Sequence, residues 1–85
     1  MTDEIKKAVE QKKIIIGTER SLKGLRQKTV KKVFISSNCP ANIADDIKHL
    51  AKLASVEIVE LNYPNDELGV ICKKQFNISV VALPK

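Results

Sequence analysis

The sequence predicts an α/β fold, because segments with the 3.6-residue period of helices alternate with short apolar runs typical of strands. Four helices and four strands in the order αβαβαβαβ fit the 85 residues with almost no length left for loops. This alternation places one central sheet between helices on both of its faces. We therefore expect one domain over residues 1–85, with functional residues on the short strand-to-helix connections.

Three apolar residues at helical spacing mark the first helix. Ile5, Ala8 and Val9 predict a helix over residues 2–11, with charged and amide side chains on its outer face. A short strand over residues 13–16 follows directly.

The second helix begins after a glycine. Thr18 can cap it, and we expect it to run to Gln27 with Leu22 and Leu25 on its apolar face. Gly24 lies inside this helix, where glycine destabilises by about 1 kcal/mol relative to alanine. A glycine in such a place predicts a close packing contact.

A buried strand and a long helix occupy the middle of the chain. The strand covers residues 32–36, and Pro40 suits the first turn of the helix. Asn42 and Asp45 resemble a capping box at its start, and the helix should end near Ala54. Four of its residues fall on one apolar face: Ile43, Ile47, Leu50 and Ala54.

The last third of the chain repeats the alternation in shorter elements. We expect a strand over residues 57–61, a turn at residues 63–65 and a short helix over residues 66–73. A loop over residues 74–77 then leads into the final strand, residues 78–83.

Positive charge is concentrated in the first part of the chain. Residues 1–34 contain ten Lys or Arg and four Asp or Glu, a net charge of +6, whereas residues 35–85 contain five and six, a net charge of −1. A one-sided basic excess is typical of a nucleic-acid-binding face. A solvated basic surface without a specific partner is the alternative.

The sequence contains no signal for a membrane or for export. No stretch reaches the ~18 apolar residues that would span a membrane. The segment from Met1 to Glu4 is acidic and lacks the apolar core of a secretion signal. Cys39 and Cys72 lie far apart, outside any paired motif, so we expect free thiols and a cytoplasmic location.

Catalytic and metal-binding patterns are missing from the sequence. Its serines have no neighbouring histidine base, and Asp45 with Asp46 suits the first turn of a helix better than a catalytic pair. A metal site formed by Cys39, His49 and Cys72 stays an alternative, although no two of them form a local chelating pair. We expect a protein that is not an enzyme and that needs no metal or cofactor.

The junction between the first strand and the second helix is the most informative feature. The apolar run over residues 14–16 stops at Gly17 and turns directly into a basic helix. The unpaired N–H groups of a helix N-terminus attract anions such as phosphate. Arg20, Lys23 and Arg26 add positive charge to the same element, so we expect a phosphate-rich partner, RNA.

Three motifs follow one another along the chain. Residues 17–23 read Gly-Thr-Glu-Arg-Ser-Leu-Lys, residues 37–40 read Ser-Asn-Cys-Pro, and residues 67–69 read Glu-Leu-Gly. The first resembles the signature of the kink-turn-binding ribosomal protein superfamily, and the third resembles the start of its last helix. The second resembles the Asn-x-Pro loop of one branch, the L-thirty-type protein of the archaeal and eukaryotic large ribosomal subunit. The resemblance is collinear over residues 5–83.

The resemblance implies a three-layer α/β/α sandwich with a mixed four-stranded sheet. It also implies binding to a sharply bent RNA internal loop with tandem sheared G·A pairs, through three segments. These segments contain the expected RNA-binding residues Gly17, Thr18, Glu19, Arg20, Ser21, Lys23, Asn38, Cys39, Pro40, Lys74, Gln75, Phe76 and Asn77.

Several of these side chains have chemistry that suits RNA. Arg20 and Lys23 lie three residues apart on one helical face, and each can neutralise a phosphate. Asn38 has both a donor and an acceptor for a base edge. Phe76 can stack on an extruded base, worth about 1–3 kcal/mol. The simpler alternatives are that Gly17 only ends a strand, that Asn38 is only a turn residue and that Phe76 belongs to the core.

The chain departs from the family pattern at several positions. Well-known kink-turn binders have Asn-Glu where this chain has Glu19 and Arg20, and a carboxylate pointing at RNA would repel phosphate. Lys73 stands where the superfamily usually has glycine. The leading hypothesis is a kink-turn-binding component of the large ribosomal subunit, with other ribonucleoprotein proteins as neighbours. The alternatives are a component of an RNA-modification or RNA-processing particle and a protein–protein interaction module.

Overall fold

The computed structural model describes residues 2–85, and the side chains of residues 2 and 3 are left out of the description. Met1, the first residue of the acidic segment from Met1 to Glu4, lies outside the described residues. Helices and strands alternate as predicted: α1 (Thr2–Glu10), β1 (Ile15–Ile16), α2 (Thr18–Arg26), β2 (Val30–Ile35), α3 (Ala41–Ala54), β3 (Glu57–Glu60), α4 (Asn65–Ile71) and β4 (Val80–Pro84).

The four strands form one mixed sheet in the order β1-β4-β2-β3. Strand β4 lies antiparallel to both β1 and β2, whereas β2 and β3 run parallel. Phe34 of β2 is therefore opposite Val81 on one side and Val59 on the other. The predicted four-stranded mixed sheet is confirmed.

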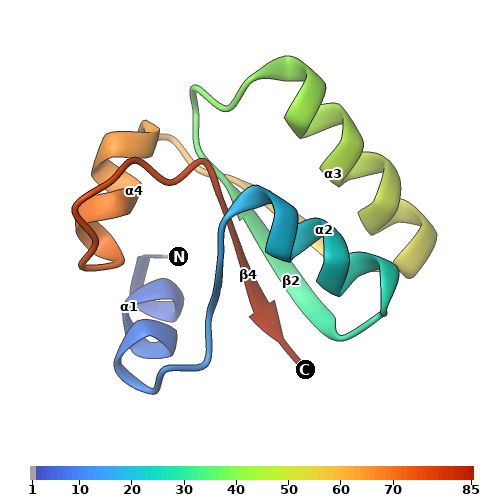
Figure 1. Ribbon diagram of the computed structural model, residues 1–85, viewed down its shortest axis with the longest axis horizontal. Coiled ribbons are helices and arrows are strands. Elements are labelled where there is room, and N and C mark those ends of the chain that lie inside the picture. Colours follow the sequence, from blue (N-terminus) through green and yellow to red (C-terminus); the bar gives the residue numbers. More distant parts are fainter. Residues whose placement is uncertain (1) are drawn as a thin grey trace.

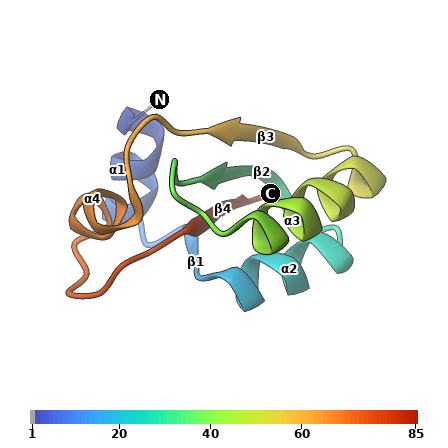
Figure 2. The same cartoon turned by 90° about the horizontal axis from the view of Figure 1, so that it is seen from above.

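Two helices cover each face of the sheet (Figures 1 and 2). Helices α1 and α4 lie on one face, and α2 and α3 lie on the other. Strand β4 serves both faces because side chains alternate along a strand. Val81 and Leu83 belong to the core under α1 and α4, whereas Val80 and Ala82 belong to the core under α2 and α3.

Each core is built from aliphatic side chains with few aromatic rings. The α1/α4 core contains Ile5, Phe34, Leu61, Leu68, Ile78 and Val81 among its buried residues. The α2/α3 core contains Leu25, Val30, Val33, Ile35, Ile47 and Val80 among its buried residues. The continuous apolar runs of the central strands follow from burial on both faces.

Strand boundaries differ from the predicted ones where local bonding interrupts the ladder. Strand β1 contains only two paired residues, and β2 begins two residues earlier than expected, at Val30. A bulge separates Val30 from Lys32 in the pairing with β4, so Lys31 has no opposite residue. Ile78 is buried but donates its N–H to the carbonyl of Asn65, so β4 begins only at Val80.

Neither of the two predicted side-chain caps forms within the described residues. Gly17 is the N-cap of α2, and Thr18 is already its first helical residue, with no side-chain cap hydrogen bond. Pro40 is the N-cap of α3, so Asn42 and Asp45 lie inside the helix and cannot form a capping box. The capping predictions for Thr18 and Asn42 are therefore wrong.

All four helices end in the same way, with a residue in the left-handed conformation. These residues are Lys12 (φ 56°), Lys28 (φ 58°), Ser55 (φ 58°) and Lys73 (φ 59°). After α2, for example, the Lys28 N–H donates to the Leu25 carbonyl (3.2 Å) and the Thr29 N–H to the Gly24 carbonyl (3.0 Å). This is the Schellman motif, which favours glycine at the left-handed position. The left-handed conformation of Lys73 explains why the superfamily usually has glycine at this position.

Two glycines permit close approach between elements. A Cβ atom on Gly24 would lie 2.6 Å from the Cγ2 methyl of Val30, so α2 packs closely on β2 as predicted. A Cβ atom on Gly69 would collide with the backbone carbonyl oxygen of Phe76. Gly69 therefore lets the connection between α4 and β4 lie directly on α4.

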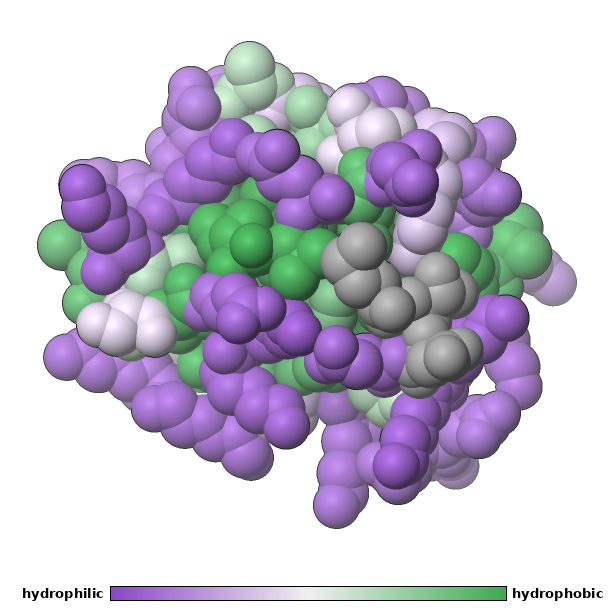
Figure 3. Space-filling view, turned by 180° about the vertical axis from the view of Figure 1, so that it is seen from behind, coloured by the Kyte–Doolittle hydropathy of each residue, from purple (hydrophilic) through white to green (hydrophobic). Residues whose placement is uncertain are grey.

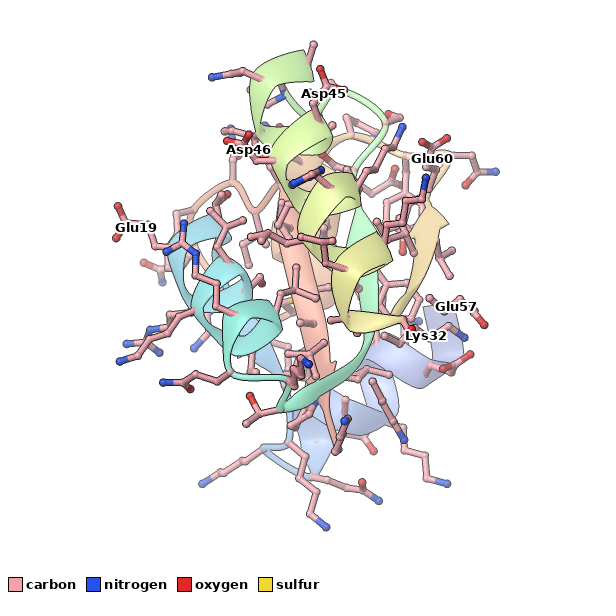
Figure 4. The ribbon with its side chains drawn as sticks, turned by 90° about the vertical axis from the view of Figure 1, so that its right-hand side faces the viewer. Glu19, Lys32, Asp45, Asp46, Glu57 and Glu60 are labelled. Atoms are coloured by element: carbon pink, nitrogen blue, oxygen red, sulfur yellow. The ribbon has the colours of Figure 1, made fainter. Side chains whose placement is uncertain are left out.

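Strand β3 is an edge strand, and it lies on the side of the molecule that Figure 3 shows. Hydrophobic surface on this side is bordered by hydrophilic residues (Figure 3). Two ion pairs flank β3. Lys48 pairs with Glu60, and Lys32 lies beside Glu57 (Figure 4), with 3.2 Å between Nζ and Oε2. Charged side chains of this kind discourage another strand from pairing with the free edge.

Candidate nucleic-acid interface

Four connections between elements meet at one edge of the sheet (Figure 1). Strands β1, β2 and β3 end at this edge and β4 begins there, because β4 is antiparallel to its neighbours. Backbone hydrogen bonds tie the connections together. The Gly17 N–H donates to the Val80 carbonyl (3.1 Å), and the Ser36 N–H donates to the Ser79 carbonyl (2.9 Å). Residues distant in sequence therefore become neighbours.

A groove of about 710 Å³ opens at this edge between the start of α2 and the connection from α4 to β4. Its rim contains six of the predicted site residues: Gly17, Thr18, Arg20, Lys74, Phe76 and Asn77. Val9, Ile14, Ile16 and Ile78 provide apolar lining. The Phe76 side chain is 57% exposed, so it lies on the surface of the groove and not in the core.

The start of α2 offers free backbone donors. Gly17 has φ 110° and ψ 154°, a conformation that L side chains rarely adopt, and a Cβ atom there would meet only open space. The first hydrogen bond within the helix runs from the Ser21 N–H to the Gly17 carbonyl (3.1 Å). No side chain among the described residues caps the turn, so the N–H groups of residues 18–20 can donate to an anion.

The groove is lined by positive charge. Arg20, Lys73 and Lys74 line it together with Lys12, and no carboxylate occurs among the described residues of its lining. Glu19 is exposed but lies outside the groove, and Figure 4 shows its side chain extending outward from the first turn of α2. The expected repulsion between Glu19 and a phosphate in the groove is thereby reduced.

Seven of the thirteen predicted contact residues do not line the groove: Glu19, Ser21, Lys23, Asn38, Cys39, Pro40 and Gln75. Lys23 and Gln75 are exposed on its outside. Ser21 is completely buried, and its hydroxyl has no hydrogen-bond partner among the described residues. The Ser21 side chain points into the protein, so this arrangement does not favour the predicted contact of Ser21 with RNA.

Asn38 links three connections through hydrogen bonds. Its Oδ1 accepts from the backbone N–H of Asn65 (2.9 Å) and from the Ser36 hydroxyl (3.2 Å). Its Nδ2 donates to Asn65 Oδ1 (3.2 Å), and Asn65 Nδ2 donates to the Ser79 hydroxyl (3.4 Å). The acceptor of the exposed Asn38 amide is thus already used, and one N–H remains for a base or a phosphate.

The other two residues of the Asn-x-Pro loop have structural positions. Pro40 precedes the first helical residue of α3. Cys39 is half-buried against the α2/α3 core, and burial raises the pKa of its thiol. Burial also raises the pKa of Cys72, which is 1% exposed in the other core. The structure brings two of the three predicted segments into one groove and holds the third beside it.

Sequence reasoning missed Lys12, Asn65 and Ser79. Lys12 lines the groove although it precedes β1, and no motif marks it. Asn65 and Ser79 complete the network of Asn38 across 27 and 14 residues of sequence. Contacts of this range depend on the sheet topology, so the local sequence contains no signal for them.

The described part of the chain contains neither a metal-binding cluster nor a membrane-spanning helix. Across residues 2–85 no group of three or more His, Cys, Asp or Glu could hold a metal ion, and His49 is exposed on α3. Both cysteines are free thiols. No described helix has the length and apolar character needed to cross a membrane.

Comparisons with known proteins agree with this arrangement. The sequence is 31% identical over 80 residues to the large ribosomal subunit protein eL30 of Saccharolobus solfataricus, covering 94% of this chain and 74% of that protein. It is 36% identical over 77 residues to eL30 of Methanosarcina mazei, covering 91% and 71%. For eL30 of Tetrahymena thermophila, the identity is 37% over 71 residues, covering 84% and 68%.

Solved structures share the fold. A 15.5kD RNA binding protein of Giardia lamblia superposes with a TM-score of 0.82 at 18% identity, covering 99% of this chain and 70% of that one. A protein of unknown function from Bacillus halodurans C has a TM-score of 0.86 at 15% identity, covering 95% and 80%. The model of the ribosomal protein L7Ae/L30e/S12e/Gadd45 family matches residues 1–85. The family resemblance carried by the three motifs is confirmed, and the chain belongs to the ribosomal protein L7Ae/L30e/S12e/Gadd45 family.

Proposed function

We propose that this protein binds kink-turn RNA as a structural component of the large ribosomal subunit in the cytoplasm. The observation that carries the proposal is the groove between α2 and the α4–β4 connection. It combines free helix N–H groups, a lining of Lys and Arg without described carboxylates, and the exposed ring of Phe76. These are the groups that bind phosphate and unstacked bases.

Each part of the groove has a separate task in this proposal. The N–H groups of residues 18–20 donate to phosphate or to a guanine edge, and Arg20 neutralises backbone charge. Phe76 stacks on a base that the bend extrudes. A straight duplex keeps its bases stacked and cannot use Phe76, so the protein binds the bent state more tightly and shifts the RNA toward it.

The chemistry of the site supports binding and not catalysis. The groove contains no described pair of nucleophile and base, and its cysteine, Cys72, is buried with a raised pKa. The eL30 names of the relatives support a place in the large ribosomal subunit over a place in an RNA-processing particle.

The test is binding to a kink-turn RNA with donor and acceptor dyes on its two stems, so that energy transfer reports the bend. A straight duplex of the same composition is the control. We expect tight binding with increased energy transfer on the kink-turn RNA and weak binding to the duplex. With four cations in the groove, the slope of log affinity against log salt should be about −3.

Equal, weak binding to both RNAs would contradict the proposal and reduce the groove to a generic basic surface. A panel of kink-turn RNAs from ribosomal and processing particles then identifies the cognate class. The tightest binding to a ribosomal kink-turn is expected, and a preference for a processing RNA would overturn the ribosomal assignment.

A further inference from the structure

A second groove, of about 320 Å³, lies at the opposite edge of the sheet from Gly17. Lys7, Lys13 and Lys31 line it, and Leu83 and Pro84 at the end of β4 place it at that edge. Hydrophilic side chains project from the corresponding lower edge in Figure 3. This second basic groove has no part in the proposed recognition of the bent loop.

The two grooves meet at the connection between α1 and β1. Lys12 lines the first groove, and its neighbour Lys13 lines the second. Three isoleucines separate Lys13 from Gly17, so four steps of extended chain give a span of roughly 13 Å. Strand β1 is an edge strand that pairs only with β4, so no described strand covers its outer side. The adjacent Lys12 and Lys13 therefore connect the positive charge of the two grooves at the α1–β1 connection.

The bulge in β2 supplies an independent feature of the second groove. Pairing with β4 moves from Val30 opposite Pro84 to Lys32 opposite Leu83, so Lys31 is the extra residue. Lys31 is exposed and lines the groove. A bulge re-aims a side chain, and bulges are frequent beside functional sites.

The carboxylate in this groove is already neutralised. Glu4 lines it, but both Glu4 oxygens contact Lys32 Nζ, at 3.0 and 3.3 Å. Hydrogen bonds to Glu4 and then to Glu57 raise the pKa of Lys32, so its ammonium group stays protonated beside these carboxylates. None of the ion pairs among the described residues involves Lys12, Lys13 or Lys31, whose charges are available to an outside partner.

The composition of the second groove selects the kind of partner. Its cations are all lysines, which act as point charges on phosphates and lack the planar fork of arginine for reading base edges. It has no aromatic residue for stacking, in contrast to Phe76 in the first groove. Such a surface suits the regular phosphate backbone of a duplex, which specifies position and not sequence.

We propose that Lys13 and Lys31 hold the phosphate backbone of an RNA stem that leaves the bent loop and runs along the edge of β1. This inference rests on the proposed binding of a bent RNA in the first groove. It adds that the protein sets the direction of one RNA stem as well as stabilising the bent loop. The first groove would contact the loop, and the second groove, on the other side of the α1–β1 connection, would contact the stem.

The experiment compares kink-turn RNAs that share one loop but carry either a short or an extended stem, with each of the two stems lengthened in turn. The double variant K13Q/K31Q removes both charges and keeps a polar side chain of similar size at each position. The variant Lys52→Gln is the control, because Lys52 is an exposed lysine on α3, on the other face of the sheet. Melting curves check that each variant is folded.

We expect the wild type and K52Q to bind tighter when one particular stem is extended, and K13Q/K31Q to lose that gain while it still binds and bends the short RNA. Because two phosphate contacts are involved, the gain should shrink about tenfold from about 50 mM to about 200 mM salt.

The outcomes separate the inference from the proposed function. If the wild type bound the bent loop equally well with short and extended stems, the stem contact would be overturned. The same conclusion would follow if K13Q/K31Q kept the increase in affinity for the extended stem. Both outcomes leave the proposed function intact. Equal losses on the short and extended RNA would mean that the lysines act only by general attraction. If the wild type showed no preference for the bent loop over a straight duplex, with either the short or the extended stem, the proposed function itself would be contradicted.

Discussion

At the scale of single residues, backbone conformation and side-chain direction decide which members of the sequence motif can reach a ligand. Gly17 needs to be glycine because of its φ of 110°, although there is ample space for a side chain. Along the next turn, Arg20 lines the groove, Ser21 is buried and Lys23 is exposed outside. One helical turn therefore contains a residue that lines the groove, a core residue and an exposed residue outside the groove.

Arg20→Ala should weaken binding to a bent RNA more than Lys23→Ala does. Arg20 lines the groove directly, whereas Lys23 acts only through longer-range attraction that salt screens. We expect the salt slope to become shallower by about one unit in R20A and to change less in K23A. RNA titrations at several salt concentrations measure the affinity and the salt slope of each variant. Equal effects of the two substitutions would show that the groove is not the RNA-binding site.

Ser21→Ala should leave RNA affinity unchanged and raise the free energy of unfolding by about 0.5–1 kcal/mol. The buried hydroxyl has no described partner to lose, and alanine is a better helix former than serine. Chemical denaturation and RNA titration of the same variant provide the two numbers. A loss of RNA affinity would mean that the hydroxyl turns outward in the complex.

At the scale of elements, the ends of the helices and the close contacts between elements set both stability and site geometry. Every helix ends in a Schellman motif without glycine at its left-handed position. That conformation is unfavourable for side chains with a Cβ atom. Glycine, the commonest signal for a helix end, is missing at all four of these positions. The predicted ends of α1, α2 and α4 lay one or two residues too late, whereas the predicted end of α3 at Ala54 is confirmed.

Lys28→Gly should stabilise the protein by about 0.5–1 kcal/mol, because relief of the left-handed strain exceeds the extra chain entropy of glycine. Lys28 is exposed with φ 58°, and it lines neither groove. Thermal unfolding of K28G against the wild type measures the gain. A lower melting temperature would show that the lysine side chain has a stabilising contact that outweighs the strain.

Gly69→Ala should reduce both stability and RNA affinity, whereas Gly24→Ala should reduce stability alone. The new Cβ at residue 69 collides with the Phe76 carbonyl and displaces the loop that carries the exposed ring. The new Cβ at residue 24 meets a methyl group of Val30 in the α2/α3 core. Overpacking of this kind costs about 1–3 kcal/mol. If G69A kept full affinity for a bent RNA, Phe76 would have no part in binding.

At the scale of the whole molecule, two cores share the central strands β2 and β4, and the connections at one edge form the site. The α2/α3 core lies away from the floor of the groove, which is formed by residues of the α1/α4 side. Stability and binding can therefore be separated by the choice of core residue.

Ile47→Ala should lower the free energy of unfolding by about 2–5 kcal/mol, a large share of the stability of so small a protein. Ile47 is fully buried in the α2/α3 core. Leu53→Ala is the matched control, since Leu53 lies on the same helix and is 67% exposed. Urea denaturation compares the two, and RNA affinity under native conditions should change in neither. Similar losses for both variants would mean that the apolar face of α3 is wrong.

Local sequence was sufficient for the order of elements, the buried face of α3 and the family, because periodicity and short motifs depend on neighbouring residues. Three residues that it singled out, Gly17, Arg20 and Phe76, line one groove in the structure. Local sequence could not predict that Asn38 Oδ1 accepts a hydrogen bond from the Asn65 N–H. Nor could it predict that Lys12 lines the first groove and Lys31 the second. Those properties arise when antiparallel β4 is inserted between β1 and β2, because this pairing alone brings the distant connections to common edges of the sheet.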